Sequence, residues 1–196
     1  MYYWSIWFIW IIVTFIMEKS IWRTVLAICV LCHMILSHWM INIMDIDMNA
    51  GYLLTCLYAC VAFVIFHSSY RVIRIMQLGS MISAYAFFKI FALYDPVWFT
   101  LIKVEWVVFG LLVLMCFTYG HHLTERMTLW MMSMCLGESL YSFAIQRLTS
   151  SVVIGDLAFL SLVVQGIIFL LGVDQLATLM TTRSSRKLVK GAAKST

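Results

Sequence analysis

Long apolar stretches alternate with short polar segments along nearly the whole chain. Each stretch is close to the roughly 20 residues that a helix needs to cross the hydrocarbon core of a bilayer. The seven stretches cover residues 2–17, 21–43, 51–67, 73–93, 99–119, 127–147 and 156–180. They are continuous and lack the strict alternation of lipid-facing strands, so the pattern predicts transmembrane helices rather than a barrel.

The polar segments between the stretches are too short to hold a folded domain. Short connections make consecutive helices antiparallel neighbours, so we expect an all-α, polytopic transmembrane helix bundle of about seven spans. The bundle would occupy residues 1–182. Residues 183–196 form a basic cytoplasmic tail that we expect to be disordered or to lie along anionic lipid headgroups.

The distribution of basic residues predicts the orientation. If the C-terminus is cytoplasmic, ten of the thirteen lysines and arginines lie on that side. The other side keeps only Lys89, Lys103 and Arg147, and its segment 44–50 contains two aspartates and no basic residue. The positive-inside rule therefore predicts an external N-terminus and a cytoplasmic C-terminus.

Composition narrows the classes of function. Of the 196 residues, 64% are hydrophobic, and nothing outside the apolar stretches is large enough for a soluble catalytic domain. Five of the thirteen basic residues fall in the tail, whereas a nucleic-acid-binding protein needs them across a folded surface. No Walker A sequence, G-x-S-x-G elbow or H-E-x-x-H pair occurs. A non-enzymatic role without nucleic acid is therefore favoured.

Glu138 is the charged residue deepest within an apolar stretch. It lies near the middle of residues 127–147, and Ser142 and Gln146 follow it at four-residue steps, so all three share one helix face. A carboxylate inside hydrocarbon costs several kcal/mol unless it is protonated, paired or hydrated. Two interpretations remain open: a proton-titrating or ligand-binding site, or a structural hydrogen bond to a neighbouring helix.

Four further polar residues lie in the same predicted outer half. They are Lys89 near the outer end of the fourth stretch, Lys103 and Glu105 at the outer start of the fifth, and His38 near the outer end of the second. Together with Glu138 they form a hypothetical ligand or proton site. The alternative for each lysine is that its long side chain extends to the outer interface.

The six cysteines all fall inside apolar stretches, so they do not form a secreted disulfide framework. Cys29, Cys32 and His33 match the C-x-x-C-H pattern of c-type haem attachment, but they lie in the middle of an apolar helix. Packing cysteines explain the pattern best, and we expect neither a metal nor another cofactor. Ser133 and Gly137, four residues apart, allow a close approach of helices within the bundle.

The N-terminal segment resembles that of a known family. The sequence Tyr2-Tyr3-Trp4, followed by Trp7, Trp10, residues 14–19 and Arg23, is similar to the start of the YphA-like small integral membrane proteins of spore-forming, Bacillus-type bacteria. The size and the multi-span layout fit along the whole chain. The resemblance implies a multi-pass protein of the bacterial cytoplasmic membrane, and it implies no activity and no functional residues.

Two functional hypotheses follow. The first is a non-enzymatic binding or association role in the envelope, with the lipid bilayer and either a membrane-protein partner or a small solute as partners. The alternative is a small-solute or proton-coupled transporter that uses the intramembrane Glu138 as its titrating group.

Overall fold

The computed structural model describes residues 2–43, 46–66, 71–146 and 153–192. The helices are α1 Tyr2–Ile11, α2 Ile21–Leu36, α3 Ala50–Phe66, α4 Arg71–Tyr94, α5 Val104–Tyr119, α6 Leu123–Gln146 and α7 Leu157–Ala192. A π-helical segment, Ile12–Ile16, continues α1, and a 3₁₀ turn, Pro96–Phe99, precedes α5. Three short strands complete the fold: β1 Met40–Ile43, β2 Ile46–Asn49 and β3 Val153–Ile154. Each of the seven apolar stretches thus contains one helix.

The second apolar stretch is helical only as far as Leu36, so the predicted helix over 21–43 is too long. The chain turns back after Leu36 because Asn49 ties the turn together. Its side-chain amide donates to the carbonyl of Ser37 (2.8 Å), and the backbone N–H of Ala50 donates to the carbonyl of Trp39 (2.9 Å). Residues 40–43 therefore pair as a strand instead of continuing the helix.

The fifth helix begins later than the apolar pattern predicts, at Val104 rather than at residue 99. Proline lacks a backbone N–H and disfavours helical geometry in the residue before it. Accordingly α4 ends at Tyr94, and Pro96 opens the 3₁₀ turn. Residues 100–103 link this turn to α5 outside any regular helix.

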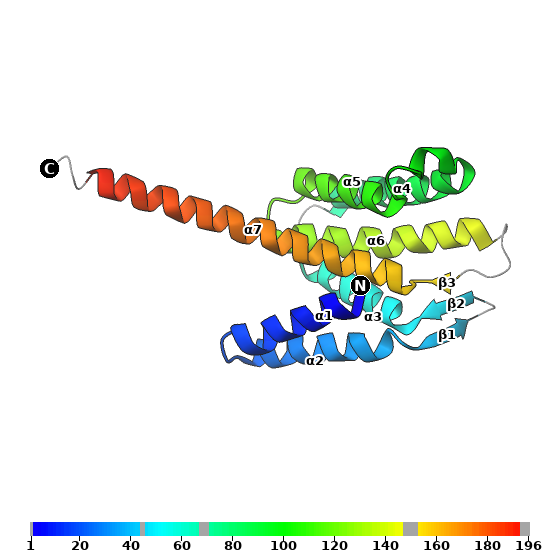
Figure 1. Ribbon diagram of the computed structural model, residues 1–196, viewed down its shortest axis with the longest axis horizontal. Helices are drawn as coiled ribbons and strands as arrows, with labels where there is room; N and C mark the ends of the chain where they lie inside the picture. The colour runs from blue at the N-terminus through cyan, green and yellow to red at the C-terminus, as the bar shows by residue number, and fades with distance from the viewer. Residues whose placement is uncertain (1, 44–45, 67–70, 147–152, 193–196) are drawn as a thin grey trace.

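The three strands form a small sheet at one end of the bundle, called the sheet end below (Figure 1). β1 and β2 pair antiparallel, with Met40 opposite Asn49, and β2 and β3 pair parallel, with Asp47 opposite Val153. The sheet therefore ties the α2–α3 connection to the start of α7. The α1–α2 and α5–α6 connections lie at the opposite end (Figure 1), so consecutive helices run in opposite directions.

The core is built around α6, which packs against α3, α4, α5 and α7. Trp130 on α6 is fully buried, and its indole N–H donates to the carbonyl of Val163 on α7 (3.1 Å). Gly166 makes this contact possible, because a Cβ atom there would lie 2.1 Å from the Trp130 ring. Small residues thus bring α6 and α7 into close contact, as they often do between membrane helices.

The outer faces of the bundle are apolar and exposed. None of the side chains of α2 is buried, and Trp4, Phe15, Ile21 and Val64 are each more than 70% exposed. By length and hydropathy, two helices within the described residues qualify as membrane spans on their own, Val72–Tyr94 and Leu157–Met180. Shorter apolar helices are Tyr2–Ile16, Ile21–Leu36, Ala50–Ile65 and Val104–Tyr119. The count of seven spans stays a prediction.

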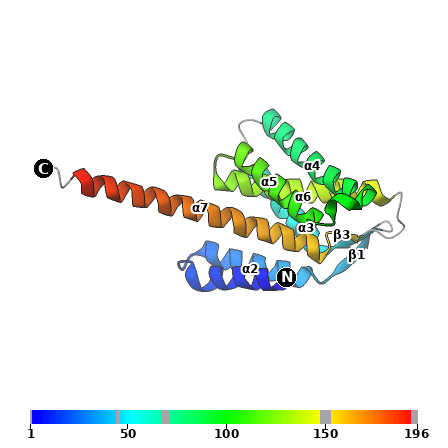
Figure 2. The same cartoon turned by 45° about the horizontal axis from the view of Figure 1, so that its top comes forward.

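Helix α7 is the longest element, with 36 residues, and its C-terminal part extends beyond the other helices (Figure 2). Its backbone is helical through residues 183–192, where the sequence favours disorder. Alanine, leucine, lysine and arginine all have high helix propensity, which accounts for this continuation. The division of the chain into a bundle and a separate tail stays a prediction.

Candidate functional site

Glu138 lies in the interior of the bundle, on the side of α6 that faces α4. The residue is 4% exposed. The hydroxyl of Tyr85 on α4 donates a hydrogen bond of 2.5 Å to Oε2 of Glu138, and Nζ of Lys89 lies 3.7 Å from the same oxygen. The sequence hypothesis placed Glu138 and Lys89 in one cluster, and the structure brings these two residues together.

Lys89 contacts aromatic rings as well as the carboxylate. Its ammonium group lies 5.0 Å from the ring centre of Tyr141 on α6 and 5.8 Å from that of Tyr85. A cation placed near an aromatic face is attracted by the negative potential of the ring. The lysine therefore points into the α4–α6 contact, and it does not extend away to the interface as the alternative expected.

Gly137 allows Tyr85 to reach Glu138. A Cβ atom at position 137 would lie 2.7 Å from the Tyr85 ring, closer than side-chain carbons normally approach. The absence of that atom lets the tyrosine pack flat against α6 one residue before the carboxylate. Gly137 thus allows the close helix approach within the chain that its spacing from Ser133 predicted.

The other predicted site residues lie elsewhere. Lys103 and Glu105 line a groove between α1, α5 and α7, which we call the α1–α5–α7 groove. His38 is exposed in the turn after α2. Of the two ion pairs among the described residues, one joins Lys89 to Glu138, and neither includes Lys103 or Glu105. The five residues of the hypothesis therefore do not form one cluster.

A second groove lies next to Glu138 along α6, and Glu138 itself is not part of its lining. It has a volume of about 600 Å³ and is formed by α4, α6 and the sheet; we call it the α4–α6 groove. Ser139, Ser142 and Gln146 supply its polar groups, and apolar residues such as Ile82 and Phe143 supply the rest. Two of the three residues on the predicted polar face of α6, Ser142 and Gln146, thus line this groove, whereas Glu138 does not.

Ser142 stands out within this groove. The residue is 2% exposed, and its hydroxyl has no hydrogen-bond partner among the described residues. In contrast, the buried hydroxyl of Ser133 on the same helix donates to the carbonyl of Trp130 (3.0 Å). A buried polar group without a partner costs about 1 to 3 kcal/mol, so such groups are uncommon in native proteins.

A hydrogen-bonded chain that the sequence reasoning missed joins the first three helices. His33 on α2 lies between the hydroxyl of Tyr2 (2.6 Å from Nδ1) and that of Thr55 (2.7 Å from Nε2). Thr55 donates its own proton to the carbonyl of Gly51 (2.8 Å), so it accepts from His33. His33 therefore carries its proton on Nε2 and accepts from Tyr2 at Nδ1. Neither residue spacing nor charge marks this contact in the sequence.

His33 belongs to the C-x-x-C-H pattern, yet its ring is fully engaged in this chain. Cys29 is half-buried and Cys32 is exposed on the same helix, and both are free thiols. Within the described residues, no three histidine, cysteine or acidic side chains come together as a metal site. The structure thus gives His33 a structural role in joining α1, α2 and α3.

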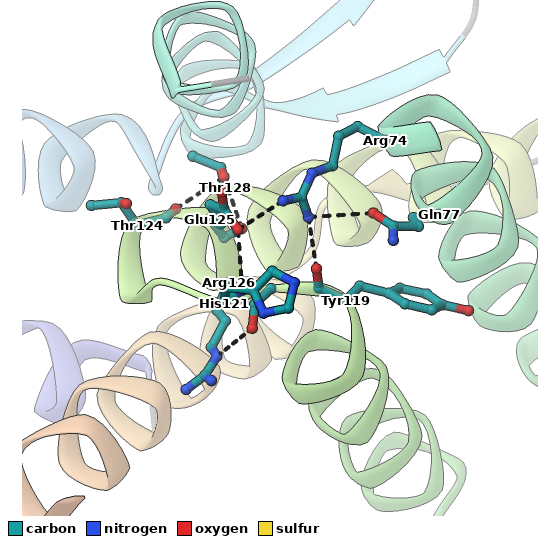
Figure 3. A network of polar contacts seen from close by, with 9 residues as sticks. Arg74, Gln77, Tyr119, His121, Thr124, Glu125, Arg126 and Thr128 are labelled. Carbon is teal, nitrogen blue, oxygen red and sulfur yellow. Dashed lines mark hydrogen bonds and ion pairs between the residues drawn. The ribbon is translucent and has the colours of Figure 1, made fainter. Parts of the chain in front are cut away.

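Figure 3 shows a second polar network, which lies around the α5–α6 turn at the end opposite to the sheet (Figure 1). The guanidinium of Arg74 on α4 pairs with Glu125 on α6 (2.9 Å) and donates to the carbonyl of Tyr119 (2.7 Å). It also donates to Gln77 (3.3 Å), and the backbone N–H of His121 donates to Glu125 (3.1 Å). These contacts connect α4 with the α5–α6 turn.

Comparison with known proteins decides the family. The model of the YphA-like integral membrane proteins matches residues 1–195. The chain belongs to this family. An uncharacterized protein of Bacillus subtilis (strain 168), YphA, is 37% identical over 98% of this chain and 96% of its own length. No solved structure matches the chain. The resemblance of the N-terminal segment is thus confirmed along the whole length.

Membership of the YphA-like family makes the chain an integral membrane protein. Its exposed apolar side chains are therefore explained as lipid-facing. In this setting a charged pair between helices is costly to form and costly to break, because water is not available to replace a lost partner. The Lys89–Glu138 pair and the α4–α6 groove beside it are the features on which a function can be built.

Proposed function

We propose that the chain is a multi-pass protein of the cytoplasmic membrane with seven spans, an external N-terminus and a cytoplasmic C-terminus. The alternating directions of the helices and the basic residues at the end opposite to the sheet support this topology. A reporter fused after Thr196 should be cytoplasmic, and one inserted in the 44–50 segment should be external. The opposite location of either reporter would contradict the proposal.

Within this topology, we propose a non-enzymatic binding role in the α4–α6 groove. The observation that carries it is the hydroxyl of Ser142, which is buried at the wall of the groove and has no hydrogen-bond partner within the part of the chain that the structure describes. The volume of about 600 Å³ lies in the range of small-molecule sites. The lining is apolar apart from Ser139, Ser142 and Gln146, so the ligand would be a largely apolar small molecule with one hydrogen-bonding group.

Replacing Ser142 by alanine tests this role. In an empty groove the hydroxyl is an unsatisfied buried group, so its removal should raise stability by about 1 kcal/mol or more. If the hydroxyl binds a ligand, Ser142→Ala should instead lower stability and reduce the amount of co-purifying molecule, measured by mass spectrometry of an organic extract. Ser133→Ala is the matched control, because that hydroxyl is equally buried but bonded to Trp130. A stabilised Ser142→Ala variant with an unchanged extract would contradict binding.

The second candidate is proton-coupled transport of a small solute. It is favoured by the position of Glu138, whose carboxylate contacts Tyr85 and Lys89 next to the groove. Glu138→Gln keeps the size of the side chain and removes its titration. Because Glu138→Gln alone leaves Lys89 without its counter-ion, it is combined with Lys89→Met. For a transport role the double variant should retain folded yield and lose proton-driven solute uptake into proteoliposomes. A loss of folded yield instead would indicate a structural carboxylate.

A further inference from the structure

The α1–α5–α7 groove carries an inference that is independent of the function proposed for the α4–α6 groove. It has a volume of about 490 Å³ and lies where α1, α5 and α7 begin. The lining combines a lysine, a carboxylate and two other polar side chains with several apolar ones. Charged and apolar groups that face one hollow in an integral membrane protein indicate an amphipathic ligand.

The two charges in this groove have opposite signs and are not neutralised by each other. Lys103 is exposed immediately before α5, and Glu105 is half-buried in its first turn. Neither residue takes part in an ion pair among the described residues. Opposite charges along one groove, with no ion pair between them, complement a ligand that carries an anion and a cation a short distance apart.

The remaining lining fits the boundary between headgroups and acyl chains. Gln165 and Ser161 on α7 add polar groups that are linked to each other (3.3 Å). On the other walls the rings of Trp106 and Tyr3 are 57% and 38% exposed. Tryptophan and tyrosine favour the membrane interface, because their rings are apolar and carry a polar group. The groove is therefore continuous with the lipid-facing surface, and a ligand that reaches it from the bilayer need not cross water.

We propose that the α1–α5–α7 groove binds the headgroup of phosphatidylethanolamine. Lys103 pairs with the phosphate, Glu105 accepts hydrogen bonds from the ammonium group, and the acyl chains lie along the exposed apolar wall. The short ethylene link of this headgroup places both charges within one small hollow. Phosphatidylcholine carries a trimethylated nitrogen that cannot donate to Glu105, and phosphatidylglycerol carries no cation.

Native mass spectrometry of the full-length protein in detergent tests the proposal. The protein is mixed with equal amounts of the three phospholipids, all with the same acyl chains, and the retained lipids are counted. Phosphatidylethanolamine should be retained about threefold or more over the other two, as expected for one or two partly exposed charge contacts. Glu105→Gln should lower retention of phosphatidylethanolamine to the level of phosphatidylcholine and leave phosphatidylglycerol unchanged.

The lysine variants complete the test. Lys103→Met should reduce retention of both phosphatidylethanolamine and phosphatidylglycerol, whereas Lys19→Met, which alters an exposed lysine at the opposite end, should change neither. Equal retention of the three lipids by the wild-type protein would overturn the proposal, and so would equal effects of the two lysine variants. If soluble phosphoethanolamine displaces the lipid at equal concentration, the lipid assignment is wrong. The wild-type series decides the question even if a variant fails to fold.

Discussion

Two ion pairs join the same two helices at different heights. Arg74 and Glu125 connect α4 to α6 near the end opposite to the sheet, while Lys89 and Glu138 connect these helices farther toward the sheet. The two basic residues are 15 positions apart on α4, which is about 22 Å along a helix, and the two acidic residues are 13 apart on α6. The pairs thus hold parallel helices together at two levels.

The chemistry of the two pairs differs. Arg74 makes a short contact of 2.9 Å to Glu125, and its guanidinium also binds two oxygens outside the pair. Lys89 lies 3.7 Å from Glu138, and the carboxylate receives its short hydrogen bond from Tyr85. A guanidinium that donates in several directions holds a fixed geometry, whereas an ammonium is a movable point charge. The arginine pair is suited to a permanent structural contact, and the lysine pair to one that can open.

The largest effect is expected from Lys89→Met. It leaves the carboxylate of Glu138, which is 4% exposed, without its counter-ion. Removing one partner of a buried pair costs about 3 to 5 kcal/mol. The free energy of unfolding, measured by detergent-denaturant titration with tryptophan fluorescence, should fall accordingly. The double variant Lys89→Met/Glu138→Gln should recover most of the loss; no recovery would mean that Lys89 acts through packing on Tyr141.

A smaller loss is expected from Arg74→Met. The side chains of Arg74 and Glu125 are 13% and 19% exposed, so water can partly replace the guanidinium of Arg74 beside Glu125. The hydrogen bonds to Glu125 and to the carbonyl of Tyr119 are lost, which should lower the free energy of unfolding by about 1.5 to 3 kcal/mol. Lys19→Met is the control and should stay within about 0.5 kcal/mol of the wild type. A loss larger than that of Lys89→Met would mean that the Arg74–Glu125 pair contributes more to stability than the Lys89–Glu138 pair.

The sequence predicted the positions of the helices better than it predicted which polar residues lie together. The length of an apolar stretch reports a helix directly, and each of the seven stretches contains one. The predicted helix boundaries are wrong at residues 37–43 and 99–103. There the backbone conformation is set by the side chain of Asn49 and by Pro96, which are not part of the apolar pattern. A hydropathy pattern contains no information on such hydrogen bonds or on the backbone restriction of proline.

Charge within an apolar stretch singled out Glu138 and Lys89, because such residues need a partner in the interior, and the structure brings the two together. That they form a ligand or proton site stays a prediction. The predicted depth of a residue in the membrane does not show which other residues it contacts. Lys103 and Glu105 were therefore grouped with Glu138 and Lys89, although they face a different groove. The Tyr2–His33–Thr55 chain was missed for a related reason. These residues lie on three different helices, and the sequence does not show that they are in contact until the packing of the helices is known.

Gly137→Ala tests whether the lysine pair depends on close packing. The new methyl group would meet the ring of Tyr85, and overpacking of this kind costs about 1 to 3 kcal/mol. Gly79→Ala on α4 is the matched control, because no neighbouring side chain or other helix among the described residues comes within 4 Å of a Cβ placed there. That control should be neutral or stabilising by up to about 1 kcal/mol, since alanine has the higher helix propensity. Equal effects of the two variants would show that Tyr85 does not need the close approach to α6.

The smallest effect is expected from Tyr85→Phe, which separates the hydrogen bond at Glu138 from its ion pair. The variant keeps the ring against Gly137 and removes only the hydroxyl that donates to Oε2. Lys89 remains close enough to hold the carboxylate, so the free energy of unfolding should fall by about 1.5 kcal/mol, the low end for a hydrogen bond to a charged group. Tyr141→Phe keeps the other ring beside Lys89 and should change stability by less than about 0.5 kcal/mol. A loss as large as that of Lys89→Met would show that the tyrosine, not the lysine, holds Glu138 in place, and the lysine would then be the group that is free to move when the pair opens.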